Sequence, residues 1–332
     1  MSSLVRLGVP GALLLCFAGP PPALAADAPP LVLEATIPLP HTTGRIDHLA
    51  MDLRRNRIFV AELGNGSVDV VDLDRRLAVH RLSGLKEPQG VLHALQPDRL
   101  VVASAGDGTV RLFSAYDFSP QGTVNLGHDA DNVRLAPGGQ MVIVGYGRGG
   151  LAIIDPAHGA LEREVSLPVH PEGFQLASDG RAYVNLPDAG DVAVVDLKTG
   201  TTTAIWKFPG MSGNFPMALG EPGIVAVAFR SPSQFVRIDQ DTGREVSRSN
   251  LCGDADDVFF DGRRQRYYVS CGEGAVATFH VDRGKVTALP AVLTAGGART
   301  SLFVPELDRM IVAVRAGLLG SNAELRVMLP TP

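Results

Sequence analysis

The sequence has too few cysteines, tryptophans and basic residues for several large classes of protein. Its 332 residues include three cysteines and one tryptophan. No Cys-x-x-Cys-His motif occurs, which excludes a covalently attached c-type haem. The single Trp206 excludes the repeated tryptophan docking pattern of quinone-dependent alcohol dehydrogenases. Because 30 basic residues face 35 acidic ones and no basic stripe is interleaved with aromatics, we do not expect nucleic-acid binding.

Motifs of familiar catalytic sites are also missing. Serine and histidine occur without the strand–turn–helix context of a nucleophile elbow. The glycine-rich turn at residues 147–150 lies between two strand patterns and opens no helix, unlike a phosphate-binding loop. No motif therefore names a substrate or a partner.

What the sequence does contain is a strand pattern that recurs seven times, at intervals of 41 to 43 residues. The copies read RIFVAELGNG from Arg57, RLVVASAGDG from Arg99, QMVIVGYGRG from Gln140, RAYVNLPDAG from Arg181, GIVAVAFRSP from Gly223, RYYVSCGEGA from Arg266 and RMIVAVRAGL from Arg309. Strand repeats of this length without a helical period are typical of propeller blades. We predict an all-β fold, a seven-bladed β-propeller with four-stranded antiparallel blades, as a single domain over residues 26–332.

The last repeat has only three strand patterns, at Thr300–Val304, Met310–Arg315 and Ala323–Met328. The segment Leu31–Ile37 precedes the first repeat and resembles the outer strands of other repeats. We therefore expect this N-terminal strand to complete the seventh blade and close the ring, which removes the open edges of a linear array. A closed ring buries its own edges, so we expect a monomer.

The N-terminus reads as a secretory signal peptide over residues 1–25. One positive charge at Arg6 precedes the apolar run Leu7–Ala18, and Ala23-Leu24-Ala25 offers small residues for cleavage after Ala25. The alternative, a retained membrane anchor, is disfavoured because the apolar run is short and three prolines follow it at 20–22. We expect a periplasmic or secreted protein with no membrane span after cleavage.

Two cysteines remain after that cleavage, Cys252 and Cys271, and both fall in the sixth repeat. They lie before its first strand and at the end of its second, positions that adjacent antiparallel strands can bring together. In an oxidising compartment we predict a disulfide between them. Two free thiols, or a thiolate that binds a metal, remain open alternatives.

The strands RIFVAEL, RAYVNLP and RYYVSCG, with turns such as Asp196-Leu197-Lys198-Thr199-Gly200, resemble the YVTN-type β-propeller repeat family of exported bacterial proteins. The segment CGDADD from Cys252, followed by YVSCG from Tyr268, resembles the form of this repeat in small periplasmic members. The resemblance covers about residues 31 to 329. It implies an exported propeller, and it carries over no catalytic motif.

Alignment of the repeats predicts which residues face the central channel. The inner strand of the first repeat is predicted at Ile46–Met51, and one position near the start of each inner strand faces the channel. Across the repeats this position holds Asp47, Gln89, Asp131, Glu172, Phe215, Asp256 and Arg299. The following position holds His48, Gly90, Asn132, Gly173, Pro216, Asp257 and Thr300, and the loops that lead in add His41, His128 and His170.

Carboxylates that converge on one channel mouth repel one another, so some stay protonated or a cation lies among them. Asp131, Glu172, Asp256 and His128 are the candidate ligands of a divalent metal. Calcium fits if oxygen atoms supply most of the ligands, and a first-row transition metal fits if histidine joins them. The alternative is structural, since polar residues at strand starts also hold water and cap strand ends.

The ends of the second strands reach the same mouth in this alignment. They contribute Glu62, Tyr146, Asn185, Arg230 and Arg315. Arg230 and Arg315, together with Arg299, could hold a carboxylate or phosphate of a ligand. They could equally neutralise the acidic ring.

Two classes of function follow from these residues. The first is a non-enzymatic binding or scaffold protein, whose channel mouth binds a small molecule, a metal ion or a segment of a protein partner. The second is a metal-dependent hydrolase or lyase, by analogy with propeller lactonases, in which His48 or His128 transfers the proton. The sequence does not decide between a binding protein and an enzyme.

Overall fold

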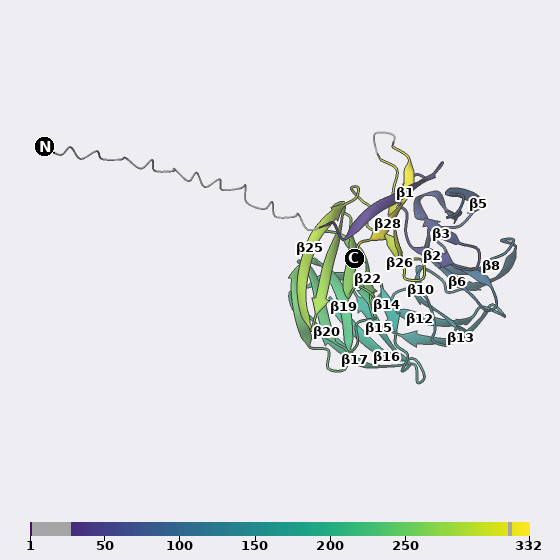
Figure 1. The fold of residues 1–332 in the computed structure, drawn as a ribbon. Helices are drawn as coiled ribbons and strands as arrows, with labels where there is room; N and C mark the ends of the chain where they lie inside the picture. Colours follow the sequence, from purple (N-terminus) through teal and green to yellow (C-terminus); the bar gives the residue numbers. More distant parts are fainter. Residues whose placement is uncertain (2–27, 318–320) are drawn as a thin grey trace.

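The computed structural model describes residue 1, residues 28–317 and residues 321–332, and it forms one ring of β-sheets (Figure 1). The predicted signal peptide, residues 1–25, lies outside the described residues apart from Met1. In the described ranges the only helix is the short 3-10 turn η1 (Leu63–Asn65). None of the described residues forms a helix of the length and apolarity that a membrane span requires.

Seven sheets, each of four antiparallel strands, make up the ring. Blade one contains β2 (Leu49–Asp52), β3 (Arg57–Glu62), β4 (Ser67–Asp72) and β5 (Leu77–Ser83), and blade two contains β6 (Pro88–Ala94), β7 (Arg99–Ser104), β8 (Thr109–Ser114) and β9 (Pro120–Asn125). Blade three contains β10 (Ala130–Leu135), β11 (Val142–Tyr146), β12 (Gly150–Asp155) and β13 (Ala160–Ser166), and blade four contains β14 (Phe174–Leu176), β15 (Arg181–Leu186), β16 (Asp191–Asp196) and β17 (Thr201–Lys207). Blade five contains β18 (Ser212–Ala218), β19 (Ile224–Ser231), β20 (Ser233–Asp239) and β21 (Glu245–Asn250), and blade six contains β22 (Ala255–Asp261), β23 (Arg266–Cys271), β24 (Ala275–Asp282) and β25 (Lys285–Leu293). Blade seven contains β26 (Ser301–Val304), β27 (Arg309–Val314), β28 (Ala323–Pro330) and β1 (Leu31–Leu39). The predicted seven-bladed propeller is confirmed.

The ring closes through the two ends of the chain. Strand β1 pairs antiparallel with β28, so that Leu31 lies opposite Pro330 and Leu39 lies opposite Ala323. Figure 1 shows this contact as the purple strand beside the yellow one. The N-terminal strand is therefore the outer strand of the seventh blade, as the short last repeat predicted.

The repeated strand is apolar throughout because both of its faces are covered. In β3, Ile58 belongs to the apolar cluster shared with Ile311 of the seventh blade, while its neighbour Phe59 belongs to the cluster shared with Leu100 of the second blade. Strands β3, β15 and β23 each bury five of their six residues. Seven clusters of buried apolar side chains fill the boundaries between neighbouring blades, so the core is distributed around the ring.

The inner strands are interrupted where they meet the channel. The strand pairing shifts between Pro88 and Val91 in blade two and between Ala130 and Val133 in blade three, and blades five and six show equivalent shifts. The inner strand of blade one begins at Leu49, so the prediction of a continuous strand over Ile46–Met51 was wrong at its start. Because a bulge suspends the alternation of sides, two successive residues can face the channel.

Close approach of neighbouring inner strands explains a glycine in this segment. A Cβ atom on Gly90 would lie 2.0 Å from the backbone oxygen of Asp131 in the next blade. A side chain at this position would force the blades apart. The glycine therefore keeps the channel narrow beside Asp131.

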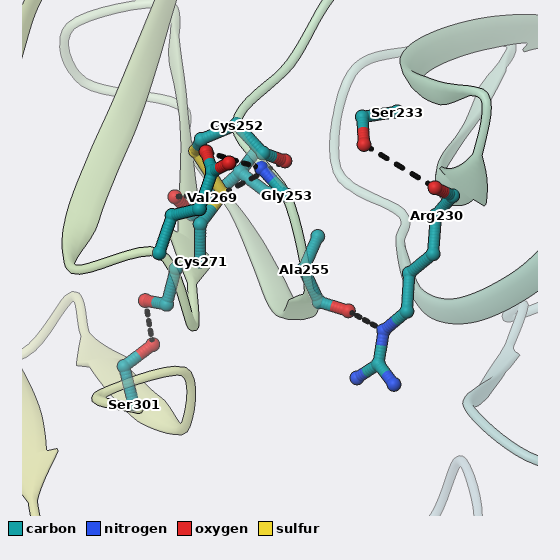
Figure 2. Close-up of a disulfide and its surroundings, with 10 residues drawn as sticks. Arg230, Ser233, Cys252, Gly253, Ala255, Val269, Cys271 and Ser301 are labelled. Atoms are coloured by element: carbon teal, nitrogen blue, oxygen red, sulfur yellow. Dashed lines mark hydrogen bonds between the residues drawn. A yellow bond between two sulfur atoms is a disulfide. The ribbon is translucent and has the colours of Figure 1, made fainter. Parts of the chain in front are cut away.

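The predicted disulfide joins Cys252 and Cys271, with their Cα atoms 5.9 Å apart (Figure 2). It links the loop before β22 to the end of β23. The carboxylate of Asp254 lies over Gly272, where a Cβ atom would be 2.1 Å from Asp254 Oδ2. The two Cys-Gly pairs of this repeat thus fix the loop that carries Asp254.

Candidate functional site

The central channel contains two adjoining cavities. The upper cavity has a volume of about 330 Å³, and the lower cavity has a volume of about 250 Å³. All seven predicted channel positions, from Asp47 to Arg299, line the upper cavity. The residues that line both cavities form a waist between them: His48, Arg134, Gln175, Asp257 and Phe259.

The upper cavity collects nearly all of the residues predicted as a ligand site. Its lining includes Asp47, His48, Asp131, Asn132, Glu172, Arg230, Asp256, Asp257 and Arg299. Arg315 is not among them, because it borders a smaller neighbouring cavity of about 140 Å³ with Arg45 and Arg299.

Three other predicted second-strand ends do not face the upper cavity. Glu62 is buried and accepts hydrogen bonds from the hydroxyls of Thr42 and Ser67. The Tyr146 hydroxyl bonds to Glu164, and the Asn185 side-chain amide donates to the backbone oxygen of Phe215. These three side chains therefore support the blades.

Arg230, Asp256 and Arg299 line one half of the upper cavity. We call these three residues the paired side, together with Asp254, which lines the smaller neighbouring cavity. Arg299 Nε lies 3.0 Å from Asp256 Oδ2, and Arg299 Nη1 lies 2.9 Å from Asp254 Oδ1. Arg230 pairs with the same two carboxylates and also donates from Nε to the Ala255 carbonyl, a contact visible in Figure 2. Both acids on this side are neutralised by protein arginines.

The opposite half, the acidic side, consists of Asp129, Asp131, His170 and Glu172. One ligand atom from each of Asp131, His170 and Glu172 lies within 4.8 Å of the others. No arginine or lysine forms an ion pair with any of these three within the described part of the chain. Asp131 is only 4% exposed, and its Oδ1 has no hydrogen-bond partner among those residues.

His170 is held in an orientation that suits metal binding. Its Nδ1 is hydrogen-bonded to the backbone oxygen of Gly147 and lies 3.4 Å from Asp129 Oδ2. Since a carbonyl only accepts, Nδ1 donates this bond, and Nε2 is the ring nitrogen left to bind a metal. That Nε2 lies 3.9 Å from Glu172 Oε1, so its lone pair is available beside the carboxylates.

The structure gathers a somewhat different set of ligands from the predicted one. His170 takes the place predicted for His128, which is exposed and rests against Gly147. Asp256 lines the cavity but is engaged by Arg230 and Arg299. Asp131 and Glu172 remain together as predicted.

Burial and mutual repulsion alter the charge of the acidic side. Burial raises the pKa of Asp131 well above its ordinary value, and the charge of Glu172 raises it further. Burial also raises the pKa of Glu172 to about 8, with added repulsion from Asp256 and Asp47. In the absence of a cation Glu172 therefore keeps its proton at pH 7, and burial shifts Asp131 toward its neutral form as well.

His48 lies at the waist among three carboxyl groups. Its Nε2 is 3.7 Å from Asp47 Oδ1 and 4.0 Å from Asp131 Oδ1, and its Nδ1 is 4.0 Å from Asp257 Oδ1. Burial, aided by the positive charge of Arg134, lowers the pKa of His48 to about 4. The imidazole is therefore neutral at physiological pH.

Sequence alignment could have found more of the lining than it did. The position two residues before the channel position supplies Arg45, Asp129 and His170 to the upper cavity. The position three residues after it lines the lower cavity in six of the seven blades, through Ala50, Leu92, Arg134, Gln175, Phe259 and Leu302. In a regular strand, residues three positions apart point to opposite sides, so strand alternation alone does not predict that both positions face the channel.

Comparison with known proteins supports the fold. No family model and no curated protein matches the chain. Hydrazine synthase of Kuenenia stuttgartiensis matches with 14% identity and a TM-score of 0.76, over 88% of this chain and 97% of that chain. A chain in a crystal structure of the mitotic checkpoint complex matches with 14% identity and a TM-score of 0.77, over 99% and 100%. At this identity the likeness shows a propeller fold alone.

Proposed function

We propose that this propeller is an exported binding protein whose upper cavity holds a divalent cation on Asp131, His170 and Glu172. The observation that carries the proposal is the convergence of these three ligand atoms within 4.8 Å, beside a buried Asp131 oxygen that has no partner in the described chain. A cation there would remove the repulsion that raises the carboxyl pKa values. It would also satisfy the unpaired oxygen.

The ligand set favours a first-row transition metal over calcium. Calcium takes six to eight oxygen ligands, whereas one imidazole with two carboxylates suits zinc, manganese or iron. Hydrogen bonding of the other ring nitrogen to a carbonyl, as at His170 and Gly147, is the usual outer contact of a metal-binding histidine. Three protein ligands leave coordination positions open to a small molecule in the cavity.

Export and family membership are part of the same proposal. The signal-like residues 1–25, the YVTN-like strands and the disulfide Cys252–Cys271 support an oxidising location such as the periplasm. A small molecule or a protein partner that approaches the channel mouth would meet the metal directly.

The test measures bound metal in the natively purified protein by plasma mass spectrometry. We expect about one equivalent of a transition metal in the natural protein and a loss of at least tenfold in an Asp131→Asn/Glu172→Gln variant. Asp256→Asn is the matched control, since it makes the same chemical change on the paired side and should retain the metal. Absence of metal after incubation with zinc, manganese and iron(II) would overturn the proposal.

A metal-dependent hydrolase or lyase is the second candidate. The observation in its favour is His48, whose Nε2 lies 4.0 Å from Asp131 Oδ1 on the wall of the same cavity. An imidazole at that distance could transfer a proton to or from a metal-bound substrate. Metal-dependent turnover of lactones or esters that is lost in His48→Gln, with the metal retained, would favour this candidate.

A further inference from the structure

The lower cavity differs in chemistry from the upper one. Its wall contains Leu49, Met51, Val91, Leu92, Val133 and Leu302, whereas carboxylates dominate the wall above. Met51, Leu92, Phe259 and Leu302 are only partly buried, although they lie in the middle of the ring. Their remaining accessible surface faces the cavity, and an apolar ligand would cover it.

One charged side chain stands among the lower residues of the inner strands. Six of the seven blades place a neutral residue three positions after the channel residue: Ala50, Leu92, Gln175, Ala218, Phe259 and Leu302. The third blade places Arg134 there, and Arg134 lines both cavities. An arginine in an otherwise neutral layer is unexpected for a structural position.

Arg134 differs from the other channel arginines in its partners. Arg45, Arg230 and Arg299 each form an ion pair with a carboxylate. Within the described residues Arg134 forms none, and its only hydrogen bond runs from Nη1 to the neighbouring carbonyl of Val133 at 2.9 Å. Its guanidinium packs 5.5 Å from the centre of the Phe174 ring. Its Nε and Nη2 donors are therefore left for a ligand.

The interior position of this cation has an energetic consequence. Burial lowers the pKa of Arg134, while the charges of Asp257 and Asp131 partly oppose that effect. Arg134 is only partly buried and keeps part of its surface accessible. A bound anion would supply the hydrogen-bonded counter-ion that it lacks among the described residues. A carboxylate matches the two free donors in geometry as well as in charge.

We propose that the lower cavity binds a small apolar carboxylic acid, with its carboxylate on Arg134 and its apolar part against Leu92, Phe259 and Leu302. This site is separate from the proposed metal site, and neither proposal depends on the other. An apolar cavity of about 150 Å³ holds benzene, so a cavity of about 250 Å³ accommodates roughly ten non-hydrogen atoms.

The test uses two acids of ten non-hydrogen atoms, phenylacetate and octanoate, and their neutral amides of the same size. Binding to the purified protein is measured by titration calorimetry at pH 7.5, with chelator present to keep the metal site out of the measurement. We expect both acids to bind about tenfold more tightly than their amides, since a charge-assisted pair contributes roughly 1.4 kcal/mol or more.

Variants separate the cavity from general electrostatics. Arg134→Gln should weaken both acids by about tenfold, and Arg134→Lys should restore part of that loss. Arg111→Gln removes a positive charge from the third strand of blade two, which lines neither cavity at this residue. It should change the affinity by less than twofold. Ala50→Leu fills the lower cavity without a change of charge and should also abolish binding.

Three outcomes would overturn the proposal. The first is that neither acid binds at millimolar concentration to the natural protein. The second is equal binding of acids and amides. The third is equal weakening by Arg134→Gln and Arg111→Gln. A thermal melt of each variant distinguishes loss of the site from loss of the fold.

Discussion

The two halves of the upper cavity use the same position of the repeat in opposite ways. On the paired side, Asp256 lies between two arginines that neutralise it. On the acidic side, Asp131 lies beside Glu172 and has no arginine within ion-pair distance in the described chain. Each aspartate begins an inner strand at a bulge, so local structure does not explain the difference.

The difference comes from the neighbouring blades. Blade five carries Arg230 next to the end of its second strand, and blade seven has Arg299 at its own channel position, so blade six receives two counter-charges. Blade three is flanked by Gln89 and Glu172, which bring none. In a ring of repeats, the charge state of one residue is therefore decided by residues of the neighbouring blades, such as Arg230 and Arg299, which lie 26 and 43 positions from Asp256 in sequence.

The largest expected effect concerns the pH dependence of stability in chelator-treated protein. The pKa of Glu172 is about 8 in the folded protein, against 4.5 unfolded. A raised folded pKa stabilises the protein at low pH, and this contribution is lost as pH rises from about 5 to about 8. We expect natural protein to lose on the order of 4 kcal/mol more than Glu172→Gln across this range, measured by urea unfolding.

The comparison with Glu172→Gln cancels the titrating groups other than Asp131, whose pKa the charge of Glu172 also raises, so the difference measures the pair. His48, with a lowered pKa, acts in the opposite direction below about pH 6.5 in both proteins. Parallel curves for the two proteins would show that Glu172 is not perturbed. Addition of a binding metal at pH 8 should recover stability in the natural protein only.

The next effect concerns the covalent support of the paired side. The disulfide closes a loop with a sequence separation of 19 between Cys252 and Cys271. In the chain-entropy model its loss costs about 3 kcal/mol. We expect Cys252→Ser/Cys271→Ser to unfold at correspondingly lower urea, while metal binding on the acidic side changes little. Loss of metal in that variant would show that the two halves are coupled.

A smaller effect separates a half-buried ion pair from an exposed one. Arg299→Met leaves Asp254 and Asp256 with Arg230 alone, and we expect a loss of about 2 kcal/mol in the free energy of unfolding. The control is Arg283→Met, because Arg283 is 92% exposed and pairs with an exposed Asp282. That change should cost less than about 0.5 kcal/mol. Equal costs would mean that the paired side contributes no more than a surface pair.

Much of the fold could be predicted because blade strands have a local signature. Ile58 and Phe59 face different neighbouring blades, so the second strand must be apolar on both sides, and this requirement recurs in every repeat. The last repeat has only three strand patterns, and this predicted that β1 completes the seventh blade, because the closed ring leaves no open sheet edge. The disulfide was also predictable, since both cysteines lie at strand ends of one repeat.

The site could be predicted only in part, because bulges change the direction of side chains. The alignment found the seven channel positions but missed Arg134, which lies three residues further along and faces the lower cavity. It named His128 rather than His170 as a metal ligand. Both histidines precede an inner strand by a few residues, so the alignment could not distinguish them. Only the backbone of the loop decides which imidazole turns toward Glu172.

The sequence by itself determined the number of blades, the closing strand and the position in each repeat that faces the channel, and it favoured the disulfide over free thiols. These follow from periodicity, which local side-chain chemistry enforces at each repeat. The tertiary structure alone decided which carboxylates are paired with arginines and which are not, and it separated the charged upper cavity from the more apolar lower one. The reason is physical: charge interactions depend on distances of a few ångströms between blades, and the sequence of any one blade does not contain those distances.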